Sequence, residues 1–145
     1  MTASQPPKPG FDAFHRERSK SIDAFAALEE AIVRLLVAVK AKAGPESFGQ
    51  KLQLLQKAKA NPEFSQVRLQ KVQACLPRCE DLNELRNDIV HSRLQIAIIG
   101  EDQRACFTNT RHCLSGSQTA RLFTLEGLRA VTTNAGKLAD ELRQI

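Results

Sequence analysis

The residues of this chain best suited to chemistry stand together in one short stretch, Arg86-Asn87-Asp88-Ile89-Val90-His91. An imidazole has an ordinary pKa of about 6.5, so His91 can accept or donate a proton near neutral pH. The guanidinium of Arg86 can hold a phosphate and offset negative charge that develops on it. Asn87 adds a polar amide beside them. The stretch therefore combines a proton-transfer group with an anion-binding group.

A helix would place these side chains on the flank of a buried stripe. On a helix Arg86 and His91 lie five residues apart and point roughly 140° away from each other, so they would not share one narrow face. Asn87 and His91 are four residues apart and lie on the same side. The apolar residues of this segment occupy the core side, and they are Leu82, Leu85 and Ile89. The polar residues are thus expected near the helix end, where a second protomer can bring its own copy.

Two helices are expected before this segment. Apolar residues at steps of three and four predict a long helix over residues 11–43, ended by Gly44-Pro45. Ser47 is expected to cap a shorter second helix, which Asn61-Pro62 ends. The apolar stripe of the first helix is Phe14, Ile22, Phe25, Leu28, Ile32, Leu35, Leu36 and Val39; that of the second is Phe48, Leu52, Leu55 and Ala58.

A third helical segment is expected to begin near Pro62 or Glu63 and to carry the Arg86 to His91 stretch. Pro77 lies inside its pattern and either kinks one helix or divides two, because proline removes a backbone donor and clashes with the preceding turn. Thr124 is expected to cap the last helix of the chain. The stripe of that last helix is Leu125, Leu128, Val131, Ala135, Leu138 and Leu142.

Between these two helical segments the pattern favours strands. Residues 94–99 and 104–110 predict a β-hairpin with a turn at 100–103, followed by a loop at 112–119. An isolated hairpin is marginally stable, so it must lie against the helices or pair with another chain. We therefore predict an all-α fold, a bundle of four or five helices with a small β-hairpin before the C-terminal helix. Residues 1–10 are expected to form a flexible leader, and residues 11–145 a single domain.

The stretch from Arg86 to His91 resembles the signature of the HEPN superfamily. The helical domains of that superfamily carry an Arg, four to six residues, then a His, often with a polar residue directly after the Arg. The preceding Leu-Asn-Glu-Leu and the following Ser-Arg-Leu are also similar to the surroundings of that signature. The order of the expected elements, two helices, the motif helix and a closing helix, is similar over residues 11–145.

This resemblance implies a metal-independent endoribonuclease that acts as a homodimer and needs no cofactor. Arg86 and His91 of both chains would line one composite cleft, with Asn87 orienting the imidazole or contacting the RNA backbone. Attack by a ribose 2′-hydroxyl would make RNA the substrate and leave a cyclic phosphate. A role as a toxin or phage-defence effector, with an antitoxin or another protein as partner, is also implied. One branch of toxins carries a Tyr two residues beyond the His, where this chain has Arg93, and the chain has no Tyr. Control by tyrosine adenylylation is therefore disfavoured.

An alternative function fits the same residues. Arg86 could pair with Asp88, Glu84 or an acidic residue elsewhere, and His91 could donate to a carbonyl where the helix ends. HEPN-like domains also include non-catalytic members. The alternative is therefore a HEPN-like dimerisation or protein-interaction module without enzymatic activity.

The charge of the chain favours an anionic partner. The formal net charge is +5 at pH 7, and basic side chains gain affinity for nucleic acid through counterion release. Arg93, Arg104 and Arg111 bracket the expected hairpin and are candidates for contacts with the RNA backbone. An ordinary solvated face is the other interpretation of these three arginines.

The four cysteines are Cys75, Cys79, Cys106 and Cys113. Their C-x3-C and C-x6-C spacings match none of the usual zinc knuckles, so we expect free thiols and no metal. Cys75 and Cys79 are expected as small core residues of one helix. The N-terminus lacks the apolar core of a secretory signal and no apolar run is long enough for a membrane helix, so a cytoplasmic protein is expected.

Overall fold

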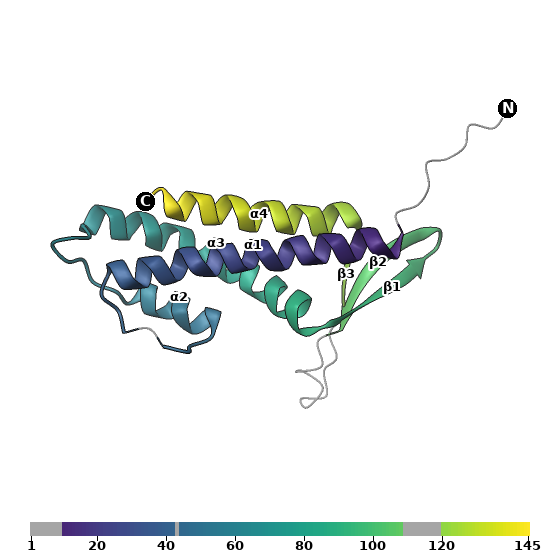
Figure 1. Cartoon of the computed structure of the whole chain (residues 1–145), viewed down its shortest axis with the longest axis horizontal. Coiled ribbons are helices and arrows are strands. Elements are labelled where there is room, and N and C mark those ends of the chain that lie inside the picture. The colour runs from purple at the N-terminus through teal and green to yellow at the C-terminus, as the bar shows by residue number, and fades with distance from the viewer. Residues whose placement is uncertain (1–9, 43, 109–119) are drawn as a thin grey trace.

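The computed structural model describes residues 10–42, 44–108 and 120–145. Over these residues the chain forms four helices and three strands (Figure 1). In chain order they are α1 (Phe11–Ala38), α2 (Phe48–Gln56), α3 (Gln66–His91), β1 (Arg93–Ile99), β2 (Asp102–Thr108), β3 (Ala120–Phe123) and α4 (Leu125–Arg143).

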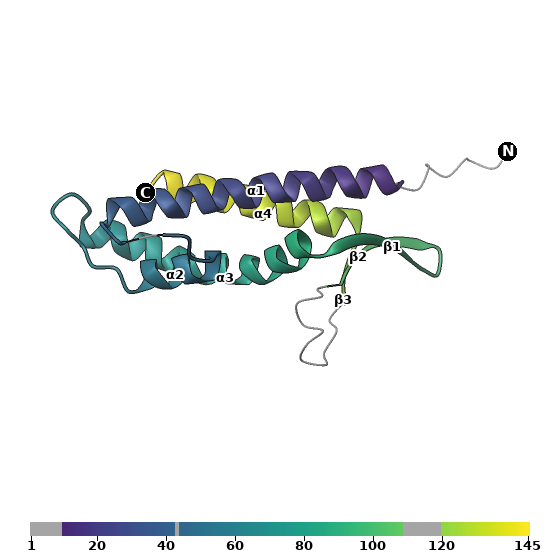
Figure 2. The same cartoon turned by 60° about the horizontal axis from the view of Figure 1, so that its bottom comes forward.

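The three long helices pack lengthwise around one apolar core. Figures 1 and 2 show α1 and α4 side by side and running in the same direction, with α3 running the opposite way. The short α2 packs against α1 and α3. The sheet lies at the end of the bundle where α1 and α4 begin. Fully buried side chains come from every long helix and from the sheet, among them Phe14, Leu28, Ile32, Leu76, Ile89, Phe107 and Leu128.

Side-chain caps fix where three of the helices begin. Ser47 and Gln50 form a reciprocal capping box at the start of α2, and the Thr124 hydroxyl accepts from the backbone N–H of Gly127 at the start of α4. Both caps are confirmed as predicted. The third helix begins later than expected, at Gln66 after the cap Ser65. The preceding residues form a turn instead, in which the Asn61 side chain accepts two backbone N–H groups.

The first helix ends at Ala38 rather than at the predicted residue 43. Lys40 adopts a left-handed conformation with φ 57°. Its N–H donates to the carbonyl of Val37, and the N–H of Ala41 donates to the carbonyl of Leu36. These two bonds form a Schellman motif, which satisfies the last carbonyls of a helix. The local turn, rather than Gly44-Pro45, therefore ends α1.

Pro77 does not divide the third helix. The structure has one helix from Gln66 to His91 with Pro77 inside it, so of the two alternatives the division into two helices is wrong. Cys75 and Cys79 are buried on this helix, as predicted. Neither they nor Cys106 forms a disulfide; Cys113 lies outside the described residues.

The fold is mostly helical but not all-α, which corrects the predicted class. The hairpin of β1 and β2 is present, and a third antiparallel strand, β3, pairs with β2 immediately before α4. The molecule is therefore α+β. The four residues of β3 are too few to show the alternation of apolar and polar side chains that marks a strand in a sequence. This strand forms because the edge of β2 that does not face β1 is free to pair with it. The predicted loop at 112–119 lies outside the described residues.

The sheet is fixed to the bundle by one of its faces. Leu94, Ala105 and Phe107 are buried, and the Phe107 ring meets Phe123 edge to face. The turn between β1 and β2 is tighter than predicted, with Gly100 at φ +64° in its first central position. No helix within the described residues is both long and apolar enough to cross a membrane.

Candidate functional site

A pocket of about 490 Å³ lies where the C-terminal half of α3 faces α1 and the start of α2. The structure brings the three predicted catalytic residues, Arg86, Asn87 and His91, into this one pocket. Its other lining residues are Glu29 of α1, Glu46, Ser47, Phe48 and Gly49 around the start of α2, and Asn83 of α3.

The arrangement of α3 explains how these residues meet. Asn83, Asn87 and His91 follow each other at steps of four and therefore stack along one side of the helix. Arg86 lies on the adjoining side and reaches the same pocket. The pocket thus covers a wider arc of the helix than one narrow face. It accommodates the angle of roughly 140° between Arg86 and His91 that helical geometry requires.

Arg86 is held by contacts to three elements. Its Nη2 lies 3.5 Å from Oε2 of Glu29 on α1, and its Nη1 lies 3.5 Å from Oδ1 of Asn87. Its guanidinium carbon lies 5.6 Å from the centre of the Phe48 ring of α2. The side chain is 20% exposed. Arg86 therefore has an acidic partner elsewhere in the chain, which is the third of the pairings considered from the sequence.

Asp88 faces away from the pocket. It is buried, and its Oδ2 accepts from Nε of Arg121 on β3 at 2.6 Å. The carboxylate within the motif thus ties α3 to the sheet and is not the partner of Arg86. Adjacent residues of a helix point about 100° apart, so Asp88 turns out of the pocket that Asn87 lines.

His91 is the last residue of α3 and is exposed. Directly after it, Ser92 adopts an extended conformation and the chain enters β1. Arg18 of α1 covers this helix end: Nε donates to the carbonyl of Ile89 at 3.1 Å and Nη2 to that of Ser92 at 2.8 Å. These bonds satisfy carbonyl groups that a helix end leaves without an internal partner. The position of His91 is therefore set by α1 as well as by α3.

Arg93 and Arg104, two of the three arginines predicted to bind RNA, do not line this pocket. Arg93 pairs with Thr108 across the ladder and Arg104 with Ala97, so both arginines lie on the same face of the sheet. Ala97, the cross-strand partner of Arg104, is four residues from Arg93 along β1, which corresponds to about 13 Å. Arg104 also lies 3.5 Å from Asp102. Arg111 lies outside the described residues.

Four polar residues around the pocket were missed by sequence reasoning. Asn83 could have been found, because it precedes Asn87 by one turn on the same side of the helix. Glu29 and Glu46 lie in other elements and carry no sequence signal that links them to the motif. Lys51 does not line the pocket, but its Nζ lies 2.7 Å from Oε1 of Glu29.

Two further observations bear on the chemistry of the molecule. Within residues 10–42, 44–108 and 120–145, no three His, Cys, Asp or Glu side chains gather as metal ligands would. Comparison with known proteins gives no match: no protein family fits the sequence, and neither a curated protein nor a solved structure is similar to it. The HEPN resemblance therefore depends on the motif residues and on the helices that carry them.

Proposed function

We propose that this protein is an endoribonuclease whose active site contains Arg86, Asn87 and His91. The observation that supports this proposal is that the three side chains line one pocket near the C-terminal end of α3. The HEPN resemblance implies the same residues and RNA as the substrate. The excess of positive charge, +5 at pH 7, favours the same class of partner.

The proposed reaction is an internal transfer at phosphorus. His91 accepts the proton of a ribose 2′-hydroxyl while that oxygen attacks the adjacent phosphorus. The bond from phosphorus to the 5′-oxygen breaks, and the leaving oxygen takes up a proton. The products are a 2′,3′-cyclic phosphate and a 5′-hydroxyl. Arg86 holds the phosphate and offsets its developing charge, while Oδ1 of Asn87, 3.5 Å from Nη1 of Arg86, orients the guanidinium.

The active form that we propose is a homodimer. One imidazole can take the proton from the nucleophile while that of the partner protonates the leaving oxygen, since the two steps require opposite protonation states. A toxin or phage-defence role, with an antitoxin that covers the pocket, would be a cellular use of such an activity. The expected solution mass is about 32 kDa, twice the 16.1 kDa of one chain. A mass of one chain at working concentration contradicts the dimer.

The test of the activity is cleavage of a labelled RNA in the presence of a metal chelator. His91→Ala is expected to lower the rate constant by at least about 100-fold, the lower end of what a general acid–base group contributes. His15→Ala is the matched control, because His15 lies on α1 and does not line the pocket. Equal cleavage by wild type and His91→Ala removes His91 from the mechanism. Expression of the wild type should also slow cell growth, whereas His91→Ala should not.

A second function is favoured by the contacts of Arg86. Its ion pair with Glu29 and its position over the Phe48 ring join α1, α2 and α3. In a non-catalytic dimerisation or protein-interaction module these contacts would serve stability alone. That function predicts that wild type cuts no RNA under any condition and that Arg86→Ala lowers the unfolding temperature.

A further inference from the structure

Glu29 lies near the middle of α1, and its carboxylate is shared between cations of two other helices. Oε1 accepts from Nζ of Lys51 on α2 at 2.7 Å, and Oε2 lies 3.5 Å from Nη2 of Arg86 on α3. All three side chains are largely withdrawn from water, with exposed fractions of 29% for Glu29, 12% for Lys51 and 20% for Arg86. Figure 2 shows α2 beside α1 and α3, the arrangement that allows this three-helix contact.

The two contacts of Glu29 are unequal. A charge-assisted hydrogen bond between nitrogen and oxygen has an ordinary length of about 2.7–2.9 Å, so the bond to Lys51 is strong and the contact with Arg86 is weak. The charge of Glu29 is therefore offset mainly by Lys51. Arg86 is oriented by the carboxylate but keeps donors and net charge for an anion. Both of its polar contacts, to Glu29 and to Asn87, are 3.5 Å long.

We infer that Glu29 is a positioning residue for Arg86 and that Lys51 controls how tightly Glu29 holds it. This inference rests on the proposed function. Lys51 draws the carboxylate charge to itself, so that the Arg86 guanidinium faces the pocket and can exchange its weak contact with Glu29 for one with the scissile phosphate. Without Lys51, Glu29 and Arg86 would form a closed ion pair that competes with RNA.

A purely structural contact among three helices makes different predictions. It predicts that changes at Glu29 or Lys51 lower the unfolding temperature but leave the cleavage constants of the folded protein unchanged. The positioning role predicts that Lys51→Met raises the KM for RNA about 10-fold with a smaller change in kcat. It also predicts that the same substitution has no further effect once Glu29→Gln has removed the carboxylate charge.

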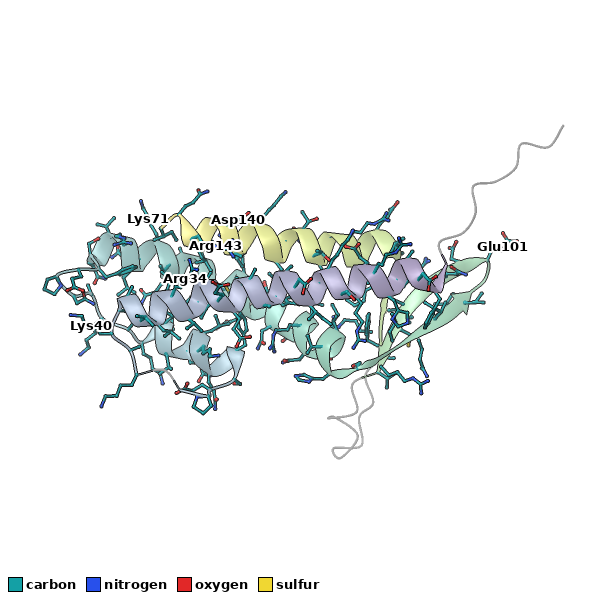
Figure 3. The ribbon with its side chains drawn as sticks, in the orientation of Figure 1. Arg34, Lys40, Lys71, Glu101, Asp140 and Arg143 are labelled. Atoms are coloured by element: carbon teal, nitrogen blue, oxygen red, sulfur yellow. The ribbon has the colours of Figure 1, made fainter. Side chains whose placement is uncertain are left out.

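The experiment measures kcat and KM for one RNA in wild type, Glu29→Ala, Glu29→Gln, Lys51→Met and the double variant Glu29→Gln/Lys51→Met. Glu29→Ala is expected to lower kcat about 10-fold or more, and Glu29→Gln to recover part of it because the amide oxygen can still accept from Arg86. Glu30→Gln is the matched control: Glu30 is the next residue of α1 and pairs with Arg34 at 2.7 Å on the exposed side. Figure 3 shows Arg34 on the outer surface of the bundle.

A second readout does not depend on catalysis. In a nitrogen–proton NMR spectrum, the side-chain Nε–H signal of Arg86, assigned by its loss in Arg86→Lys, should move in Glu29→Gln and stay in place in Glu30→Gln. If wild type cuts no RNA, the proposed function fails and this signal still tests the positioning of Arg86. The inference is overturned if the Arg86 signal stays in place in Glu29→Gln. It is also overturned if, in an active enzyme, the effects of Glu29→Gln and Lys51→Met on the cleavage constants simply add in the double variant. Both results leave the ribonuclease proposal intact.

Discussion

Within the stretch from Arg86 to His91, neighbouring residues lie on different sides of one helix. Arg86, Asn87 and His91 line the pocket, whereas Asp88 and Ile89 are buried. Asp88 is joined to Arg121 of β3 by an ion pair that is only partly shielded from water, with side-chain exposures of 11% for Asp88 and 40% for Arg121. The motif therefore combines the candidate chemistry with the attachment of α3 to the sheet.

Cys79 provides a pH-dependent test at the scale of one residue. Burial, followed by the charge of neighbouring Cys75, raises the pKa of its thiol from 9.0 to about 12. In the unfolded chain this thiol ionises first, so between about pH 9 and pH 12 the unfolded state binds fewer protons and stability falls as the pH rises. We expect this group to lower the free energy of unfolding by about 1.4 kcal/mol per pH unit in that window.

The measurement is urea unfolding of wild type and Cys79→Ala from pH 8 to pH 11. As the pH rises, the free energy of unfolding of wild type should fall more steeply than that of Cys79→Ala. The difference in this free energy between the two proteins should therefore narrow. Parallel curves would show that Cys79 ionises equally in both states. At pH 8 this thiol should also resist alkylation in the folded protein and react in urea.

At the scale of elements, the junction of α3 and β1 depends on a side chain from α1. Arg18 donates to the carbonyls of Ile89 and Ser92, and its guanidinium carbon lies 6.0 Å from the centre of the Phe107 ring. The Arg18 guanidinium thus joins α1 to the end of α3 and to β2. It does so next to His91, the residue proposed to transfer a proton. A helix end so held cannot fray without breaking these contacts.

Arg18→Met should therefore destabilise the protein by about 1.5–3 kcal/mol, the value of hydrogen bonds made by a charged group. Arg34→Met is the control, since its ion pair with Glu30 is exposed and such pairs contribute less than about 0.5 kcal/mol. Chemical unfolding followed by circular dichroism measures both. Equal losses in the two variants would contradict a special role for Arg18.

At the scale of the whole molecule, one face of the sheet packs against the helical core. The turn between β1 and β2, the tip of the sheet, extends beyond that core. Glu101 marks that tip in Figure 3, beyond the ends of the helices. Phe107 is fully buried, whereas Ile98, close to the tip on the neighbouring strand, is 71% exposed. Bundle and sheet should therefore unfold as one cooperative unit, with the tip contributing little.

Phe107→Ala is expected to cost about 3–5 kcal/mol, as for a large-to-small change in a well-packed core. Ile98→Ala should change stability by no more than about 0.5 kcal/mol, because an exposed side chain loses few contacts. Urea unfolding followed by a helix signal tests both variants. If Phe107→Ala leaves the unfolding midpoint of the helix signal unchanged, the sheet is not part of the cooperative unit.

The sequence by itself determined the helices, two of their caps and the β1–β2 hairpin. These features depend on local periodicity and on spacings of three or four residues, which a chain displays wherever it folds. Tertiary structure alone decided the strand β3, the pairing of Asp88 with Arg121, and the placing of Glu29 and Lys51 around Arg86. Each of those depends on contacts between segments far apart in the chain. No local pattern specifies which distant edge or charge a segment will meet.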